Sequence, residues 1–140
     1  LASLTTTAVR DGDEYVITGH KIWTSYSDVA DWCLVLARTD KDVPKHKGIS
    51  AFIVNMHQPG IAQRPLKMIS GVTKEFGQVE FDGARVPVGN MIGEPGDGWK
   101  LAMFPLNANV GVFHLIDSLT RSSAPRMISR ARCSIGSTRV

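Results

Sequence analysis

The sequence has few cysteines and no long apolar run. Its two cysteines, Cys33 and Cys133, have no spacing with histidines that is typical of a metal or redox site, so a reduced and buried Cys33 is favoured. The longest uninterrupted apolar run extends from Trp32 to Ala37, far below the roughly 20 residues that a membrane-spanning helix needs. Residues 1–10 contain no basic segment followed by an apolar core, which argues against a secretory signal. We therefore expect no membrane span, no metal site and a cytoplasmic location.

The sequence also lacks the common patterns of hydrolytic and nucleotide-binding sites. The histidines are far apart and have no paired-ligand spacing; they are His20, His46, His57 and His114. No nucleophile-elbow pattern is present. The glycine-rich loop 93–98 precedes a predicted helix, but its spacing fails both nucleotide-loop patterns and Pro95 removes one backbone donor. A simple helix entry is favoured over a phosphate site there.

Positive charge is concentrated at the C-terminal end. The net charge is +3, yet the segment from Ser118 to Val140 contains no acidic residue. Its arginines are Arg121, Arg126, Arg130, Arg132 and Arg139. Without this segment the chain is close to neutral, with acids and bases interspersed. A basic surface with few aromatic residues beside it is more often solvated than bound to nucleic acid, so we expect no nucleic-acid partner.

Turn residues divide most of the chain into short apolar segments. A length of 140 residues favours one core. Asp11-Gly12-Asp13 predicts a hairpin turn, and Pro65 predicts an edge strand or a bulge. The predicted strands cover residues 4–10, 14–18, 21–25, 30–38 and 48–56, with a bulge or bend at Gly19. Residues 61–69 have mixed patterning, and a loose alternation at 76–81 is predicted to end in a turn at Asp82-Gly83-Ala84 before residues 85–88. The strands at 30–38 and 48–56 are expected to be buried on both faces. Asp97 predicts the start of a helix. The spacing predicts a mainly β fold, an antiparallel barrel or sandwich followed by the start of a helix.

The stretch from Gly19 to Ser25 is the strongest candidate for a binding site. Regular strand alternation would place Trp23 and Ser25 on the same face. A flat indole beside a hydroxyl suits a planar heteroaromatic ligand with polar edges. From these residues alone, an ordinary core tryptophan followed by a capping serine is the simpler interpretation.

Several spaced motifs resemble the middle domain of acyl-CoA dehydrogenases. They occur in order and extend from about Leu4 to Met103. The segments that carry the resemblance are Asp11-Gly12-Asp13-Glu14-Tyr15 through Ser25, Ala30-Asp31-Trp32, Lys47-Gly48-Ile49 through Val54, Pro59-Gly60-Ile61, Val79-Glu80-Phe81 through Pro87, Asn90 through Glu94, and Gly98 through Met103.

The resemblance implies a fold, a cofactor and a reaction. In that family a middle β-barrel lies between two helical domains and helps to hold FAD. The enzyme oxidises an acyl-CoA thioester to a trans-2-enoyl-CoA, with hydride transfer to flavin N5. The resemblance implies that Trp23 packs beside the flavin, that Ser25 hydrogen-bonds near N5 where many relatives have threonine, and that Thr24 contributes mainly backbone contact. It also implies electron-transfer flavoprotein as a partner, a homo-oligomer (tetramer or dimer), and a mitochondrial-matrix location if the source is eukaryotic.

The chain departs from the family at both ends. Residues 1–96 are predicted to form the middle β domain, 97–106 to start the helix of the C-terminal domain, and 107–140 to form a divergent basic tail that is either disordered or frame-shifted. The resemblance places the catalytic glutamate in the C-terminal helical domain, so no catalytic residue is assigned to this chain. We expect the chain to be inactive by itself. The alternative function is a non-catalytic β-barrel binding module, either a small-molecule carrier or a basic single-strand nucleic-acid binder.

Overall fold

A long two-stranded hairpin begins the sheet. In the computed structural model, which describes the chain except for residues 70, 72–75, 109–132 and 136–140, β1 (Thr7–Asp11) pairs antiparallel with β2 (Glu14–Ser25). The turn between them contains Gly12 at φ 61°, a left-handed conformation that glycine adopts without strain. The predicted hairpin at Asp11-Gly12-Asp13 is confirmed.

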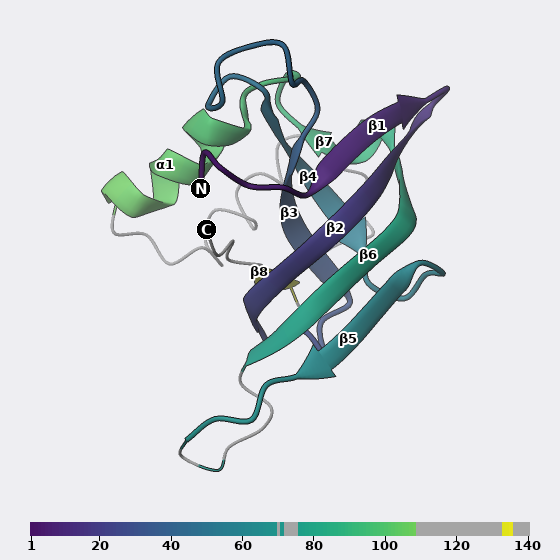
Figure 1. Ribbon diagram of the computed structural model, residues 1–140, viewed down its shortest axis with the longest axis vertical. Helices are drawn as coiled ribbons and strands as arrows, with labels where there is room; N and C mark the ends of the chain where they lie inside the picture. Colours follow the sequence, from purple (N-terminus) through teal and green to yellow (C-terminus); the bar gives the residue numbers. More distant parts are fainter. Residues whose placement is uncertain (70, 72–75, 109–132, 136–140) are drawn as a thin grey trace.

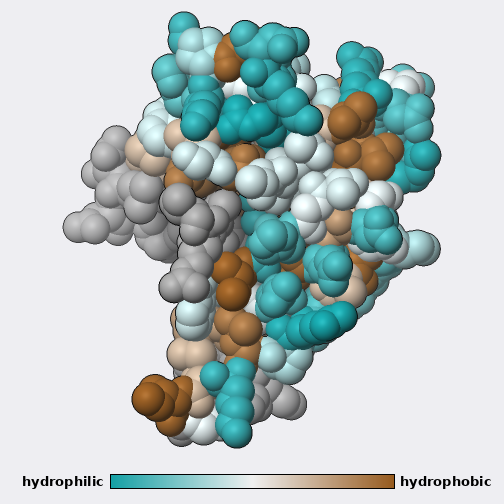
Figure 2. All heavy atoms as spheres, in the orientation of Figure 1, coloured by the Kyte–Doolittle hydropathy of each residue, from teal (hydrophilic) through white to brown (hydrophobic). Residues whose placement is uncertain are grey.

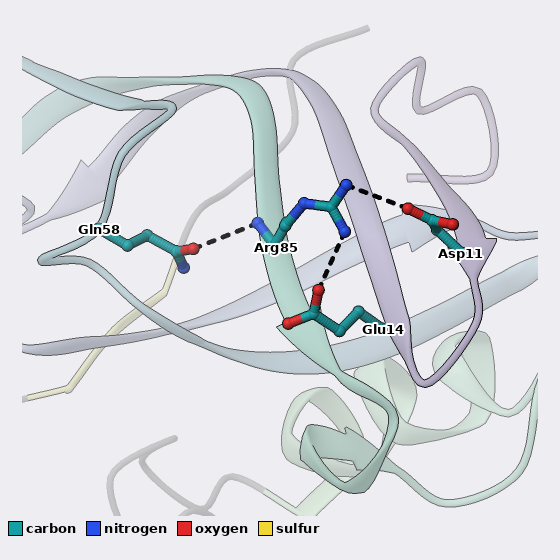
Figure 3. A network of polar contacts seen from close by, with 4 residues as sticks. All are labelled: Asp11, Glu14, Gln58 and Arg85. Atoms are coloured by element: carbon teal, nitrogen blue, oxygen red, sulfur yellow. Dashed lines mark hydrogen bonds and ion pairs between the residues drawn. The ribbon is translucent and has the colours of Figure 1, made fainter.

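An arginine ties this hairpin to a strand from much later in the chain. Arg85 donates through its guanidinium to Asp11 and to Glu14, both at 3.0 Å, and its backbone N–H donates to the side-chain oxygen of Gln58 (Figure 3). The hydrogen bonds that Arg85 donates to Glu14 and then to Asp11 raise the pKa of Arg85. Because all these groups are exposed to water, the network contributes more to register than to stability.

The hairpin lies within one mixed sheet. The other strands are β3 (Trp32–Arg38), β4 (Ile49–Asn55), β5 (Ile61–Pro65), β6 (Phe76–Pro87), β7 (Met91–Ile92) and β8 (Cys133–Ile135). Their order is β5-β6-β2-β1-β3-β4-β7, with β8 also paired to β3. All pairs are antiparallel except β1 with β3 and β3 with β8. The predicted mainly β fold is confirmed, and Pro65 ends the edge strand β5 as predicted. The turn predicted at Asp82-Gly83-Ala84 is wrong, because β6 continues through these residues and accommodates Gly83 as a bulge opposite β2.

The sheet curls so that its two halves enclose a single core. Figure 1 shows β3 and β4 behind the layer formed by β2 and β6. The ring centroids of Tyr15 on β2 and Phe52 on β4 are 5.0 Å apart across this core. β4 is buried on both faces, as predicted, but in β3 only alternate residues are fully buried. The prediction for β3 was wrong because one of its faces is only partly covered.

A helix follows β7 in the chain. A 3-10 turn, η1 (Val88–Asn90), precedes β7, and α1 spans Gly98–Ala108. Gly98 lies so close to the backbone of Ile49 that a Cβ there would meet the Ile49 carbonyl oxygen at 2.7 Å. This contact seats the start of the helix against β4. Asp97 directly precedes the helix as predicted, although its carboxylate accepts a hydrogen bond from the Glu94 N–H.

Two further predictions concern the ends of the chain and the membrane. In the described part of the chain, no helix is both long enough and apolar enough to cross a membrane. Most of the predicted basic tail, 107–140, lies outside the described residues; α1 includes its first two positions and β8 accounts for three more.

Candidate functional site

A β-bulge interrupts β2 at the predicted binding stretch. Along the pairing with β6, Lys21 is opposite Val79 and Thr24 is opposite Gly77, so β2 contains one extra residue between these pairs. Trp23 lies in this bulge with φ 63°. The regular alternation predicted from Lys21 to Ser25 is therefore wrong, because the extra residue changes which face the following side chains take.

The bulge directs Trp23 outward beside Ser25. The Trp23 side chain is 41% exposed. Its ring packs edge-on against Phe76, with centroids 6.1 Å apart and an interplanar angle of 74°. Phe76 is directly opposite Ser25 in the β2–β6 register, which puts their side chains on the same face. Trp23 and Ser25 thus share a face, although by a bulge rather than by alternation.

Thr24, the third predicted residue, lies on the opposite side. It is fully buried, and its hydroxyl oxygen has no hydrogen-bond partner within the described residues. Gly77, its partner on β6, is also buried, and a Cβ added there would overlap the Ser27 hydroxyl. The structure therefore brings Trp23 and Ser25 together at the surface and places Thr24 in the interior behind them.

The backbone at this site is held in strained conformations. Trp23 and Tyr26, at φ 63° and 51°, are the non-glycine residues with positive φ in the described part of the chain. The Tyr26 carbonyl accepts hydrogen bonds from the N–H groups of Val29 and Ala30, at 3.1 and 3.0 Å, which fixes the turn after β2. Left-handed backbone costs roughly 1–2 kcal/mol at a residue with a side chain. Such strain persists only where the surrounding structure holds the residue in place. Both strained residues here, Trp23 and Tyr26, carry exposed aromatic rings.

Lys21 is a buried charge that the sequence interpretation did not single out. Its side chain is 1% exposed and its Nζ donates to the Leu36 carbonyl at 2.8 Å. Burial lowers its pKa to about 8, and the Cys33 thiol opposes that change. Its burial could have been predicted from its position in the strand. Lys21 is separated from the buried residues Tyr15 and Ile17 by an even number of positions, which places all three on the same face of a regular strand.

The arrangement is suited to binding rather than to bond-breaking. An exposed indole can stack or pack against a planar ring, and a neighbouring hydroxyl can donate to or accept from its polar edge. No group of three or more potential metal ligands occurs among the described residues.

On the face drawn in Figure 2, hydrophobic residues form separate patches divided by hydrophilic ones.

Comparison with known proteins connects this geometry to a family. The sequence model described as "Acyl-CoA dehydrogenase, middle domain" matches residues 1–84. The curated protein acyl-CoA dehydrogenase IpdE1 of Mycobacterium tuberculosis is 48% identical over 112 residues, which are 80% of this chain and 29% of that protein.

Solved structures agree with the sequence match. The ChsE4-ChsE5 complex from Mycobacterium tuberculosis aligns with a TM-score of 0.68 at 42% identity, over 76% of this chain and 27% of the matched one. The glutaryl-coenzyme A dehydrogenase glutaryl-CoA complex aligns with a TM-score of 0.72 at 31% identity, over 77% and 27% respectively. The chain thus spans under a third of the length of each of these three relatives.

Proposed function

Because this chain belongs to the acyl-CoA dehydrogenase family, as its middle domain, we propose that it forms part of the FAD site of a flavin-dependent acyl-CoA dehydrogenase. The reaction of the whole enzyme would be the α,β-dehydrogenation of an acyl-CoA thioester to a trans-2-enoyl-CoA. Bound FAD would supply the hydride acceptor for this reaction.

The observation that carries this proposal is the exposed Trp23 ring on a strained bulge beside Ser25. In the proposed site, Trp23 provides the apolar wall and Ser25 the polar contact to the edge of the ring. Phe76 limits how the indole can turn, since the two rings meet edge to face. Thr24 contributes through its backbone, because its side chain is buried behind the wall. The residues present therefore fit a planar, polar-edged cofactor.

A titration of FAD into the 140-residue chain tests this assignment. Flavin fluorescence is expected to be quenched saturably, because indole rings quench a flavin packed against them. Trp23→Ala should abolish the quenching, whereas Trp99→Ala should not. Trp99 is a suitable control because its ring contacts His46 on another part of the molecule, with centroids 6.3 Å apart. Equal loss in both variants, or no loss in either, would remove Trp23 from the proposed site.

We further propose that proton abstraction depends on residues outside this chain. The family places its carboxylate base in a helical domain, and this chain spans 29% of the IpdE1 relative. The chain mixed with acyl-CoAs, FAD and an artificial electron acceptor should show no turnover. Robust dehydrogenation would contradict the proposal.

Partners are proposed on the same basis. Acyl-CoA is the proposed substrate and electron-transfer flavoprotein the proposed electron acceptor of the whole enzyme. One solved relative is a complex of two named proteins, ChsE4 and ChsE5, which supports assembly of the whole enzyme into an oligomer. The comparisons do not favour the alternative of a non-catalytic carrier or nucleic-acid-binding barrel.

A further inference from the structure

Strand β3 has one edge that is fully paired. On that edge β4 runs antiparallel to it from Trp32 to Arg38. Just before this ladder, the Met56 N–H donates to the Asp31 carbonyl at 2.9 Å. Because successive residues of a strand direct their N–H and C=O groups to opposite edges, the main-chain groups of Trp32 and of every second residue after it point away from β4.

The opposite edge of β3 is paired by three different groups. At its end, the Arg38 N–H donates to the Thr6 carbonyl at 2.8 Å, which is the start of the short contact with β1. One step back along that edge, the Leu36 carbonyl accepts from the Lys21 ammonium at 2.8 Å. From Trp32 to Leu34 the pairing is made by β8. Neither β1 nor β2 therefore supplies the strand that pairs with the first part of β3.

β8 fills that part of the edge as an inserted strand. It runs parallel to β3, with Trp32 opposite Cys133, Cys33 opposite Ser134 and Leu34 opposite Ile135. It also lies in contact with β2, and Figure 1 shows it beside the lower end of that strand. Main-chain groups that are removed from water without a partner cost roughly 1–3 kcal/mol each. On this edge of β3, the extended backbone of β8 supplies the partner from Trp32 to Leu34.

We propose that the edge of β3 from Trp32 to Leu34 is an acceptor site for one extended, parallel strand, and that its occupant is the C-terminal segment of this chain centred on Ser134. The pairing spans only three residues of β8. When a strand is added to a sheet edge, main-chain hydrogen bonds supply the affinity, so a separate peptide can replace the chain's own strand. A peptide with the sequence of residues 128–140 therefore binds the same edge when the chain's own segment is prevented from pairing.

The test uses amide hydrogen exchange in the full chain, followed by NMR, and needs no flavin. Ser134→Pro removes the N–H of the central β8 residue, and Ser134→Ala is the matched control that keeps it. In the proline variant the Leu34 amide should exchange at least tenfold faster than in the alanine variant. The Val35 amide faces β4 and should stay protected in both, which shows that the sheet remains folded. Unchanged Leu34 protection in the proline variant would overturn the proposal.

Adding the peptide in trans completes the test. Excess peptide of residues 128–140 should restore Leu34 protection in the Ser134→Pro chain, whereas the same peptide carrying proline at position 134 should not. Failure of the unmodified peptide to restore it would refute the acceptor site.

A second measurement applies if the proline variant loses Val35 protection as well. The wild-type chain is then titrated with peptide carrying a nitroxide at its first residue. Because a tethered segment has an effective concentration of about millimolar, the peptide is used above that level. Parallel insertion should broaden the Trp32 amide signal more than that of Arg38. Equal broadening, or none, would contradict the proposal.

Discussion

Replacing Thr24 by valine should stabilise the protein. The substitution keeps the shape of the side chain and exchanges the hydroxyl for a methyl group. The Thr24 hydroxyl is buried without a hydrogen-bond partner within the described residues. A buried polar group in that state costs roughly 1–3 kcal/mol, and an added buried methyl contributes about 0.8 kcal/mol. Together these terms predict that the free energy of unfolding rises by about 2–4 kcal/mol.

Thr6 provides the matched control. It is as buried as Thr24, at 1% exposure, but its hydroxyl donates to the His20 carbonyl at 3.2 Å. Thr6→Val removes that bond, so it should lower the free energy of unfolding by about 1 kcal/mol. The two variants receive the same change in atoms and should move in opposite directions.

Urea unfolding followed by circular dichroism measures both effects, and thermal unfolding gives an independent check. For a domain of this size, 1 kcal/mol corresponds to a shift of roughly 3–5 °C in Tm. If Thr24→Val destabilises the protein as much as Thr6→Val does, the Thr24 hydroxyl has a hydrogen-bond partner and the reasoning is refuted. FAD affinity should be unchanged in Thr24→Val, because the side chain lies behind the proposed wall.

Three further predictions concern other residues of the sheet. Because the pKa of Lys21 is lowered to about 8 from 10.5, the folded chain binds fewer protons than the unfolded chain between these values, and wild-type stability should rise there. In urea titrations, the stability of the wild type relative to Lys21→Met should therefore increase by about 3 kcal/mol between pH 7 and pH 10.5. A constant difference across that range would show that Lys21 is not desolvated. Gly77→Ala should cost about 1–3 kcal/mol because its Cβ overlaps the Ser27 hydroxyl, and Gly77→Ala combined with Ser27→Gly should recover part of this loss; no recovery would assign the loss to another contact. At high salt, the Tm of Arg85→Gln should equal that of the wild type within experimental error, because the ion-pair partners Asp11 and Glu14 are exposed to water. A large loss of Tm that does not depend on salt would contradict this.

The parts of the fold that were predictable from the sequence follow local rules. The turn at Gly12 needs only a glycine between two apolar-polar segments, and the edge position of β5 follows from the missing N–H of Pro65. The two-sided burial of β4 follows from its continuous apolar composition. In each case the residues that determine the structure lie within the element itself.

The details of the candidate site depend on residues that are distant in sequence. The bulge at Trp23 is set by the register with Gly77 on β6, and no local pattern marks a tryptophan for left-handed backbone. The burial of Lys21 requires the Leu36 carbonyl as its partner. The sequence could identify the face that carries Trp23 and Ser25, but not how the backbone brings them onto it. The insertion of β8 was not predicted either, since the C-terminal segment has no strand-like alternation.

The pairing of β2 with β6 also determines when the site can form during folding. The hairpin of β1 and β2 closes over a tight turn, whereas Thr24 and Ser25 meet Gly77 and Phe76 across a long stretch of chain. Closing a long loop loses more chain entropy before any contact compensates for it, and non-local strand pairing is slow. The hairpin should therefore form early, and the bulge that exposes Trp23 should form late. Pulse-labelled amide exchange during refolding would detect this order as early protection in β1 and delayed protection at Thr24.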